Sequence, residues 1–294
     1  MPNERQRQVS LKKSRMIASW ERRPPIIPVA ILIIVVVAAI FAPLIASYPP
    51  KIGKLADKLM PPAWIDGGSI THPLGTDQLG RDILSRVIYG ARISLLVAVL
   101  AIFFAGTIGT TIGVVSGYVG GYIDAFFMRL TDVAFSIPLM LLAIILVAAI
   151  GPSLNNLILV ITLLLWPYYA RQVRGETLSI KERDFIALAR VAGLSNLHIM
   201  WRHIFPNVTP TVLVLATLHS AFVILLEASL SFLGVGIPPP TPAWGLMIGD
   251  GRMYLTTAWW IILWPGLAVI LTVLSINLLG DWLRDWLDPK LRQV

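Results

Sequence analysis

The sequence predicts an all-α integral membrane protein with six membrane-spanning helices, and three observations lead to this fold class. Hydrophobic residues make up 56% of the 294 positions and charged residues only 14%, too few to cover a water-exposed surface. Six stretches are apolar over roughly the 20 residues that cross a hydrocarbon core of about 30 Å. None of them contains lysine or arginine, and Glu227 is their one acidic residue.

Composition also limits the chemistry of the chain. With no cysteine, disulfides, thiolate zinc sites and cysteine nucleophiles are excluded. The formal charge of +8 fits basic cytoplasmic loops, and no basic patch interleaved with aromatic residues indicates nucleic-acid binding. The sequence contains no His-Glu-x-x-His, Gly-x-Ser-x-Gly or Gly-x-x-x-x-Gly-Lys-Ser/Thr pattern. We therefore expect no catalytic site, and no metal or cofactor bound by this chain.

The spans and the segments between them follow from the apolar runs. The spans are predicted at 26–47, 93–115, 133–150, 154–170, 211–235 and 258–279. The segment 1–25 precedes the first span, and the loop 48–92 separates this span from a transmembrane domain over 93–282. That domain contains the polar loop 171–210, and the chain ends in a tail over 283–294. The first apolar run exceeds the about 7–15 residues of a signal-peptide core, so we expect a retained helix.

The distribution of lysine and arginine predicts the orientation. With six spans, the two ends of the chain share one side with the loops 116–132 and 171–210. That side holds 17 of the 24 Lys and Arg residues, and the other side holds seven. Since positive loops stay in the cytoplasm, both termini are predicted to be cytoplasmic in a multi-pass protein of the cell membrane.

The loop 48–92 ends in an amphipathic stretch. Within 81–92, four apolar residues fall on one helical face and four polar ones on the other, which predicts a helix on the membrane surface before the chain enters the bilayer at Ile93. His72, Asp77 and Asp82 carry metal-binding side chains, but their spacing matches no known metal motif. Helix capping and a local Asp77–Arg81 pair are the simpler interpretation.

Four glycines recur at four-residue spacing in the second span. Gly109, Gly113, Gly117 and Gly121 would share one helical face, where small residues let another helix approach closely. Helix packing is therefore the predicted role of Gly109, Gly113 and Gly117, whereas Gly121 lies at the start of the following loop.

The loop 171–210 predicts two short helices joined by a sharp turn. Glu182 to Ala192 is rich in helix formers and Gly193 is a natural stop. Ser195 can cap a second helix that ends near Pro206. The apolar face of this element could dock on a partner protein or fold against its own bundle, and spacing alone leaves both interpretations open.

Two polar residues fall within the fifth predicted span. A charged side chain in a bilayer is costly and usually faces a cavity or a partner. Glu227 is therefore either a gate or passage residue, or a carboxyl that holds helices together, and His219 is expected to be a hydrogen-bonded packing residue. At the C-terminus, Trp282, Leu283, Trp286 and Leu287 predict an interfacial helix that Pro289 ends.

The 171–210 loop also resembles the EAA loop of ABC importer permeases. The resemblance rests on Ala187-Leu188-Ala189-Arg190-Val191-Ala192-Gly193 followed by His203-Ile204-Phe205-Pro206. Ala187 stands where that family often has an acidic residue, and Leu188 replaces its first alanine, whereas Ala189, Gly193 and Pro206 match.

Three further regions resemble the C-type permease subunit of dipeptide, oligopeptide and nickel importers. They are His72–Leu95, Glu227–Gly245 and Gly280–Arg292, with patterns such as His-Pro-Leu-Gly-Thr-Asp and Glu-Ala-Ser-Leu-Ser-Phe-Leu-Gly. The likeness covers nearly the whole chain from the first span onward.

The resemblance implies a type I ABC importer permease fold, with one N-terminal helix before a five-helix core. It further implies a second permease subunit, two ATPase subunits or domains that carry ATP and Mg²⁺, and an external substrate-binding protein. The coupling residues would be Ala187, Leu188, Ala189, Arg190, Gly193, Ser195, His203 and Pro206. A stand-alone secondary transporter is the alternative, and Glu227 and His219 are its only candidates for ion coupling.

Overall fold

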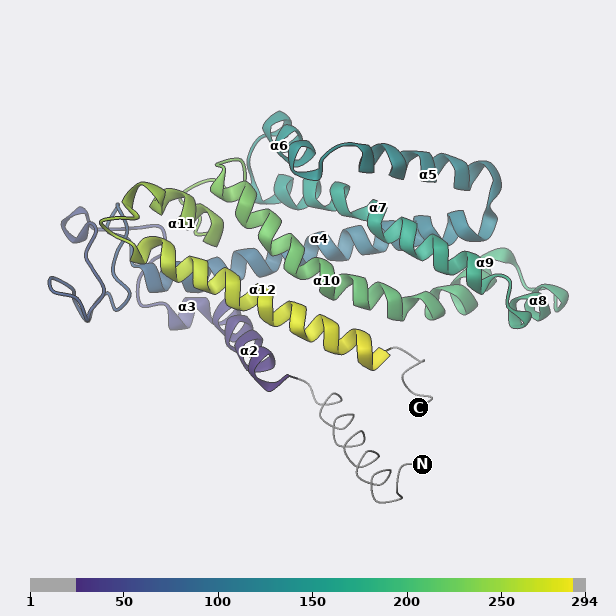
Figure 1. Cartoon of the computed structure of the whole chain (residues 1–294), viewed down its shortest axis with the longest axis horizontal. Helices are drawn as coiled ribbons and strands as arrows, with labels where there is room; N and C mark the ends of the chain where they lie inside the picture. The colour runs from purple at the N-terminus through teal and green to yellow at the C-terminus, as the bar shows by residue number, and fades with distance from the viewer. Residues whose placement is uncertain (1–24, 288–294) are drawn as a thin grey trace, which may run out of the picture.

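The apolar stretches of the sequence fold into long helices that lie side by side. The structure is a computed structural model and describes residues 25–287. Within that range there is no β-strand, and a single isolated bridge pairs Thr76 with Asp82. The long helices are α4 (Ile83–Val119), α7 (Leu154–Ile180), α10 (Phe205–Phe232) and α12 (Trp260–Leu287), which run along the length of the molecule in Figure 1.

Shorter elements occupy the two ends and the side of this bundle. The helices α2 (Ile26–Ile40) and α3 (Ala42–Ile45) pack beside α4, and α2 also contacts α12. One end of the molecule carries the 46–82 loop, which includes a 3₁₀ turn (Leu55–Asp57), together with α11 (Trp244–Gly251) and the turn Arg252–Tyr254. The opposite end carries α8 (Asp184–Val191) and α9 (Asn196–Ile199).

The hydrophobic core lies between α4, α7 and α10. Small residues on α4 leave space for larger side chains of α7. The buried small residues include Ala98, Ala101 and Ala105, and the α7 side chains that pack in this core include Leu157, Ile161 and Leu165. The exposed surface of the helices is itself apolar, as a lipid-facing surface requires. Ile34 is 66% exposed, Phe103 62% and Ile270 60%.

Length and composition show three helical segments among residues 25–287 that can cross a membrane. They are Ile83–Val119, Asn196–Phe232 and Trp260–Trp286. The helices α5 (Gly121–Ser136) and α6 (Leu139–Ile150) qualify together as a fourth, although they meet at an angle of 94°. The structure thus shows an all-helical protein with three or four apolar spans, and the count of six remains a prediction.

The third span differs from its prediction. The sequence predicts a loop over 116–132 and a straight span over 133–150, but α5 already begins at Gly121 and the chain bends between α5 and α6. Pro138 explains the bend, because a residue before proline avoids the helical conformation, and Ile137 is extended with φ −102° and ψ 131°.

The start of α4 also differs from its prediction. No separate surface helix ends near Ile93, because α4 is continuous from Ile83 to Val119. The polar face predicted to meet water is buried instead, with Ser85 and Arg86 each 1% exposed. Both side chains find partners in the 46–82 loop, and this packing replaces the contact with water.

One predicted helix end is wrong, and another predicted helix is not a separate element. The helix capped by Ser195 does not end near Pro206, because it passes through a π-helical turn (Met200–Ile204) directly into α10. Pro206 is the second residue of α10, which directly follows the π-helical turn, and in such a turn the regular α-helical hydrogen-bond pattern is interrupted. The predicted interfacial helix at 282–287 is the last part of α12, and Pro289 lies outside the described residues.

Candidate functional site

The helix–turn–helix element at one end of the bundle follows the local signals of the sequence. α8 ends at Val191, and Gly193 adopts a left-handed φ of 76°, which confirms it as the helix stop. The amide of Leu194 donates to the carbonyl of Ala189 at 3.2 Å. The side chain of Ser195 accepts a hydrogen bond from the amide of His198, which confirms the predicted cap.

This helix–turn–helix element packs on the end of α4 that is predicted to lie on the cytoplasmic side. The Tyr118 hydroxyl donates to Asn196 Oδ1 at 2.9 Å, and the Arg190 guanidinium lies 5.4 Å from the centre of the Tyr118 ring. Ile186 and Ala189 are buried in a small core that also includes Val173, Ile180, Ile199 and Ile204. One face of the element therefore packs on the bundle, as one of the two open interpretations requires.

The opposite face of the element is apolar and exposed. Leu188 is 68% exposed and Val191 86%, and Ala187, Arg190, Gly193, Ser195 and Pro206 are exposed with them. A hollow of about 570 Å³ beside this face is lined by His198, Trp201, Arg202 and Pro206, and the partly buried His203 lies 6.3 Å from His198 between ring centres. Exposed apolar patches of this kind mark surfaces that bind another protein or a membrane.

The glycine row of α4 faces α7 over its whole length. A Cβ added at Gly113 would lie 2.7 Å from the carbonyl oxygen of Ala170 and 2.9 Å from the Cβ of Val173. At Gly117 it would lie 2.8 Å from the Cβ of Thr177, and at Gly109 it would collide with the α7 main chain. Only glycine allows this approach, which also brings Lys181 Nζ to the Gly117 carbonyl at 3.0 Å.

Glu227 is enclosed by its own chain. Its side chain is fully buried, with Ser94 Oγ of α4 donating to Oε2 at 2.9 Å and Ser231 Oγ donating to Oε1 at 2.8 Å. Ser231 Oγ in turn accepts from the amide of Ile237 at 3.2 Å. The carboxyl therefore ties α10 to α4 and to the turn that follows α10.

His219 packs through its ring. It meets Tyr168 and Tyr169 edge-on, with ring centres 5.5 and 5.1 Å away. The expected hydrogen bond is missing at Nδ1, which is buried without a partner among the described residues, as is the Tyr169 hydroxyl. The structure does not bring His219 and Glu227 into one site, because their contacts are with different residues.

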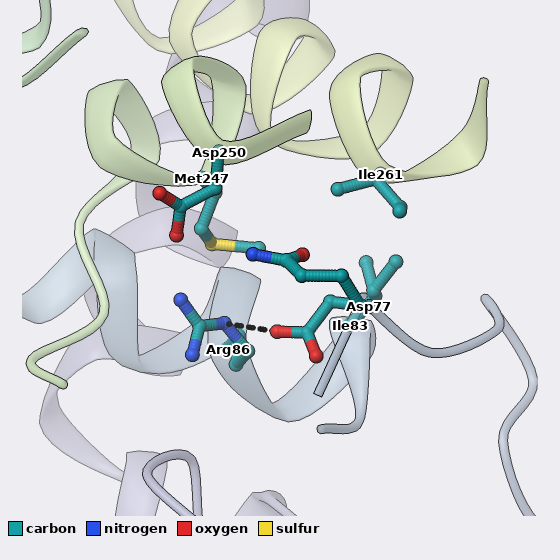
Figure 2. A pocket seen from close by; sticks show the side chains of 7 residues that line it. Asp77, Ile83, Arg86, Met247, Asp250 and Ile261 are labelled. Carbon is teal, nitrogen blue, oxygen red and sulfur yellow. Dashed lines mark ion pairs between the residues drawn. The ribbon is translucent and has the colours of Figure 1, made fainter. Parts of the chain in front are cut away.

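A buried charge network at the other end of the molecule was not predicted beyond one pair. Asp77 Oδ2 accepts from Arg81 Nε at 2.6 Å, which confirms the local pair, and it lies 3.5 Å from Arg86 Nε. Figure 2 shows Arg86 and Asp77 facing each other while Asp250 and Met247 reach toward them from α11. Arg81 also lies 3.8 Å from Asp250 Oδ2.

The network holds the 46–82 loop on the ends of three helices. Arg86 donates to the carbonyl of Pro50 at 3.3 Å. Trp260 Nε1 donates to the carbonyl of Thr76 at 3.1 Å, and Trp244 Nε1 to that of Val87 at 2.9 Å. Burial raises the pKa of the Asp250 carboxyl, although Arg81 and Arg86 act in the opposite direction.

The residues that could be imagined as metal ligands serve this loop instead. Asp82 caps α4 by accepting from the amide of Ser85 at 2.8 Å, and its other oxygen lies 2.9 Å from His72 Nδ1. No group of three metal-binding side chains occurs within residues 25–287. These side chains hold the loop against the start of α4.

The chain is similar to permease proteins of peptide transport systems. A model of the family described as binding-protein-dependent transport system inner membrane component matches residues 109–293. The dipeptide transport system permease protein DppC of Escherichia coli (strain K12) is 48% identical over 262 residues, 89% of this chain and 87% of that protein. The di/tripeptide transport system permease protein DppC of Pseudomonas aeruginosa (strain UCBPP-PA14) is 41% identical over 90% of this chain and 87% of its own length.

A third relative extends this similarity. The dipeptide transport system permease protein DppC of Haemophilus influenzae is 40% identical over 93% of this chain and 92% of its own length. The matches therefore include the 46–82 loop and the helix–turn–helix element as well as the apolar bundle.

Proposed function

Because the chain belongs to the binding-protein-dependent transport system inner membrane components and is a membrane permease of an ABC importer, we propose that it forms half of a pathway for peptides or similar small solutes. An external binding protein delivers the solute, and a second permease subunit supplies the other half. Two partner ATPase subunits or domains hold ATP and Mg²⁺ and drive the passage. This chain itself is non-catalytic.

The observation that carries the coupling proposal is the exposed apolar face over 187–206. Leu188 and Val191 are exposed on a helix whose other face is buried on the bundle. An ATPase that covers this face would push on α8 and α9, and α9 continues through the π-helical turn into α10. A continuous helix transmits such a displacement as a rigid body. The residues assigned to coupling are Ala187, Leu188, Ala189, Arg190, Gly193, Ser195, His203 and Pro206.

Replacing Gly193 by valine tests this coupling. Valine in a left-handed conformation is disfavoured by about 1–2 kcal/mol, so the turn between α8 and α9 opens and the face is misplaced. We expect solute uptake per ATP hydrolysed to fall about tenfold, the factor to which such an energy corresponds, while the complex still inserts. Uptake and hydrolysis are measured together in proteoliposomes that contain the whole transporter.

Gly151 provides the matched control for that substitution. It also has a left-handed φ, of 88°, and like Gly193 it has nothing within 4 Å of an added Cβ, but it lies at the end of α6. Gly151→Val also places a side chain at a positive φ that L residues rarely adopt, but away from the coupling face, so uptake per ATP is expected to stay unchanged. Equal uptake ratios in the two variants would contradict the coupling role.

We assign six spans to the described helices by pairing the short ones. The six are the pair α2 and α3, the helix α4, the pair α5 and α6, and the helices α7, α10 and α12. In this assignment α2 is an anchor beside a five-span core. α7 has 27 residues, about 40 Å at 1.5 Å per residue, which is enough to cross. Both termini then lie in the cytoplasm of a multi-pass inner-membrane protein, and the 46–82 loop lies outside.

We propose that Glu227 serves helix packing rather than gating. We propose that His219 likewise packs inside the bundle and does not couple ions. The support for Glu227 is its enclosure by the hydroxyls of Ser94 and Ser231. We likewise propose that Gly109, Gly113 and Gly117 serve helix packing.

The substitutions Glu227→Ala and Glu227→Gln separate packing from gating. Alanine leaves two buried hydroxyls without an acceptor and creates a cavity, so the loss of stability is expected to be about 2–4 kcal/mol. Glutamine retains an acceptor oxygen, so both the thermal midpoint and uptake are expected to stay close to wild type. A glutamine variant that melts normally but no longer transports would show that the carboxyl acts in gating.

A further inference from the structure

Three lysines of the 46–82 loop differ from the other cations around them. Lys51, Lys54 and Lys58 are exposed, whereas Arg81 and Arg86 are buried and paired with Asp77. Among the described residues, no acidic side chain forms an ion pair with any of the three lysines. They are therefore available to a ligand that carries negative charge.

Exposed apolar side chains alternate with these lysines. Ile52 is 69% exposed and Leu55 74%. A surface with cationic and aliphatic side chains in alternation is typical of segments that lie in the headgroup region of a membrane, where the aliphatic groups reach the acyl boundary. Water alone would leave both aliphatic side chains hydrated at a cost of about 25 cal/mol per Å².

The lysine segment is held firmly to the rest of the loop. The amide of Lys54 donates to the carbonyl of Gly80 at 3.3 Å, and that of Leu59 to Asp77 at 3.0 Å. Just before the lysines, the amide of Tyr48 donates to Ser85 Oγ at 3.2 Å. The three ammonium groups therefore project from a fixed backbone, which lowers the entropy lost when a ligand binds.

Two features place this segment at the boundary of the bilayer. The first lysine comes six residues after the end of α3, and Leu44 of α3 is 82% exposed and Ile40 of α2 63%, as lipid-facing side chains are. Trp64 of the same loop is 60% exposed and meets Trp264 of α12 edge-on at 5.9 Å between ring centres. Tryptophan is enriched where a membrane meets water, so the loop lies at headgroup level.

We propose that Lys51, Lys54 and Lys58 form a binding site for the phosphate headgroups of anionic phospholipids, with Ile52 and Leu55 inserted at the acyl boundary. The site is independent of the transport function proposed above, since it requires only that the helices span a bilayer. Each lysine near a membrane surface favours anionic lipid about fivefold. An acidic protein surface is the competing ligand, but it would not account for the aliphatic residues between the lysines beside lipid-facing α3.

The absence of cysteine in the sequence allows a clean test. Ala56 is exposed between the lysines, so Ala56→Cys carries a bimane fluorophore in the full-length chain within its assembled transporter in nanodiscs. Brominated phosphatidylglycerol and brominated phosphatidylcholine are compared as quenchers at equal mole fraction. We expect phosphatidylglycerol to quench at least fivefold more efficiently, and the ratio to fall toward one in 1 M salt, where charges are screened.

Variants of the lysines identify the groups responsible. The triple variant Lys51→Gln, Lys54→Gln and Lys58→Gln should bring the quenching ratio to about one, whereas arginine at the same three positions should retain it. Arg252 is an exposed cation at the same end, and Arg252→Gln should leave the ratio unchanged. A ratio of one in the unmodified chain overturns the proposal. The proposal is also overturned if the quenching ratio is one without the binding protein and the added binding protein shields the fluorophore. In that case the lysines would serve protein docking.

Discussion

Replacing Gly113 by leucine is expected to separate α4 from α7 and to prevent the chain from assembling into a stable bundle. The added Cβ would lie 2.7 Å from the Ala170 carbonyl oxygen and 3.0 Å from the Arg174 amide nitrogen. Both are main-chain atoms of a helix and cannot move aside as a side chain would. We expect a loss of at least about 3 kcal/mol, the upper end of what overpacking a core costs.

The consequence extends beyond the glycine because other contacts depend on the same approach. Arg174 Nε and Nη2 donate to the two oxygens of Asp124 at 2.5 and 2.6 Å and thereby join α7 to α5. Displacing α7 would strain this bidentate pair. Assembly is measured by fluorescence-detected size-exclusion chromatography after heating, which gives an apparent melting temperature without purification.

Gly175 is the internal control for this experiment. Like Gly113 it lies inside a helix, here α7, but an added Cβ would have nothing within 4 Å. Gly175→Leu is expected to assemble as the wild type does, because leucine is a better helix former than glycine. If Gly113→Leu melted at the same temperature as Gly175→Leu, the close approach of α4 and α7 would be refuted.

Replacing Asp77 by alanine is expected to destabilise the 46–82 loop by about 3–5 kcal/mol, the cost of removing one partner of a buried ion pair. The loss is large because one carboxylate serves two cations. Arg81 and Arg86 side chains are 4% and 1% exposed, and without Asp77 both would lose their nearest counter-charge. Asp77 Oδ1 also accepts from the amides of Leu79 and Arg81 at 2.8 and 3.0 Å, so the turn would lose its internal acceptor.

Hydrogen exchange over 46–82 measures this effect locally. Asp77→Ala should raise the exchange of this loop and of α11, which the network contacts through Asp250, and leave α8 and α9 unchanged. Asp66→Ala is the control, because Asp66 lies in the same loop and is exposed. Equal exchange in the two variants would show that the buried charges do not hold the loop.

The parts of the molecule that could be predicted depend on neighbours in the sequence. The stop at Gly193, the cap at Ser195 and the Asp77–Arg81 pair all involve residues at most five positions apart, and local backbone chemistry decides them. The row from Gly109 to Gly117 predicts a close helix contact from its spacing, because small residues let helix backbones approach each other in a membrane.

The parts that could not be predicted depend on distant partners. The stretch 81–92 has the same amphipathic pattern whether its polar face meets water or buried carboxylates, and the partner Asp250 lies far along the chain. Pro206 by itself predicts a helix end. The π-helical turn before it changes which backbone N–H groups have to donate hydrogen bonds within the helix. Neither condition is visible in the neighbouring residues.

The 46–82 loop has a consequence for the order in which the protein is made. A hydrogen bond joins Thr76 of this loop to Trp260 across 184 residues. A second hydrogen bond, between Val87 of α4 and Trp244 of α11, spans 157 residues. Ribosomes deliver the N-terminal part first, so these two contacts can form only after Trp244 and Trp260 have been made. The docking of the loop on α12 is therefore a late event of biogenesis, which follows the synthesis of Trp260.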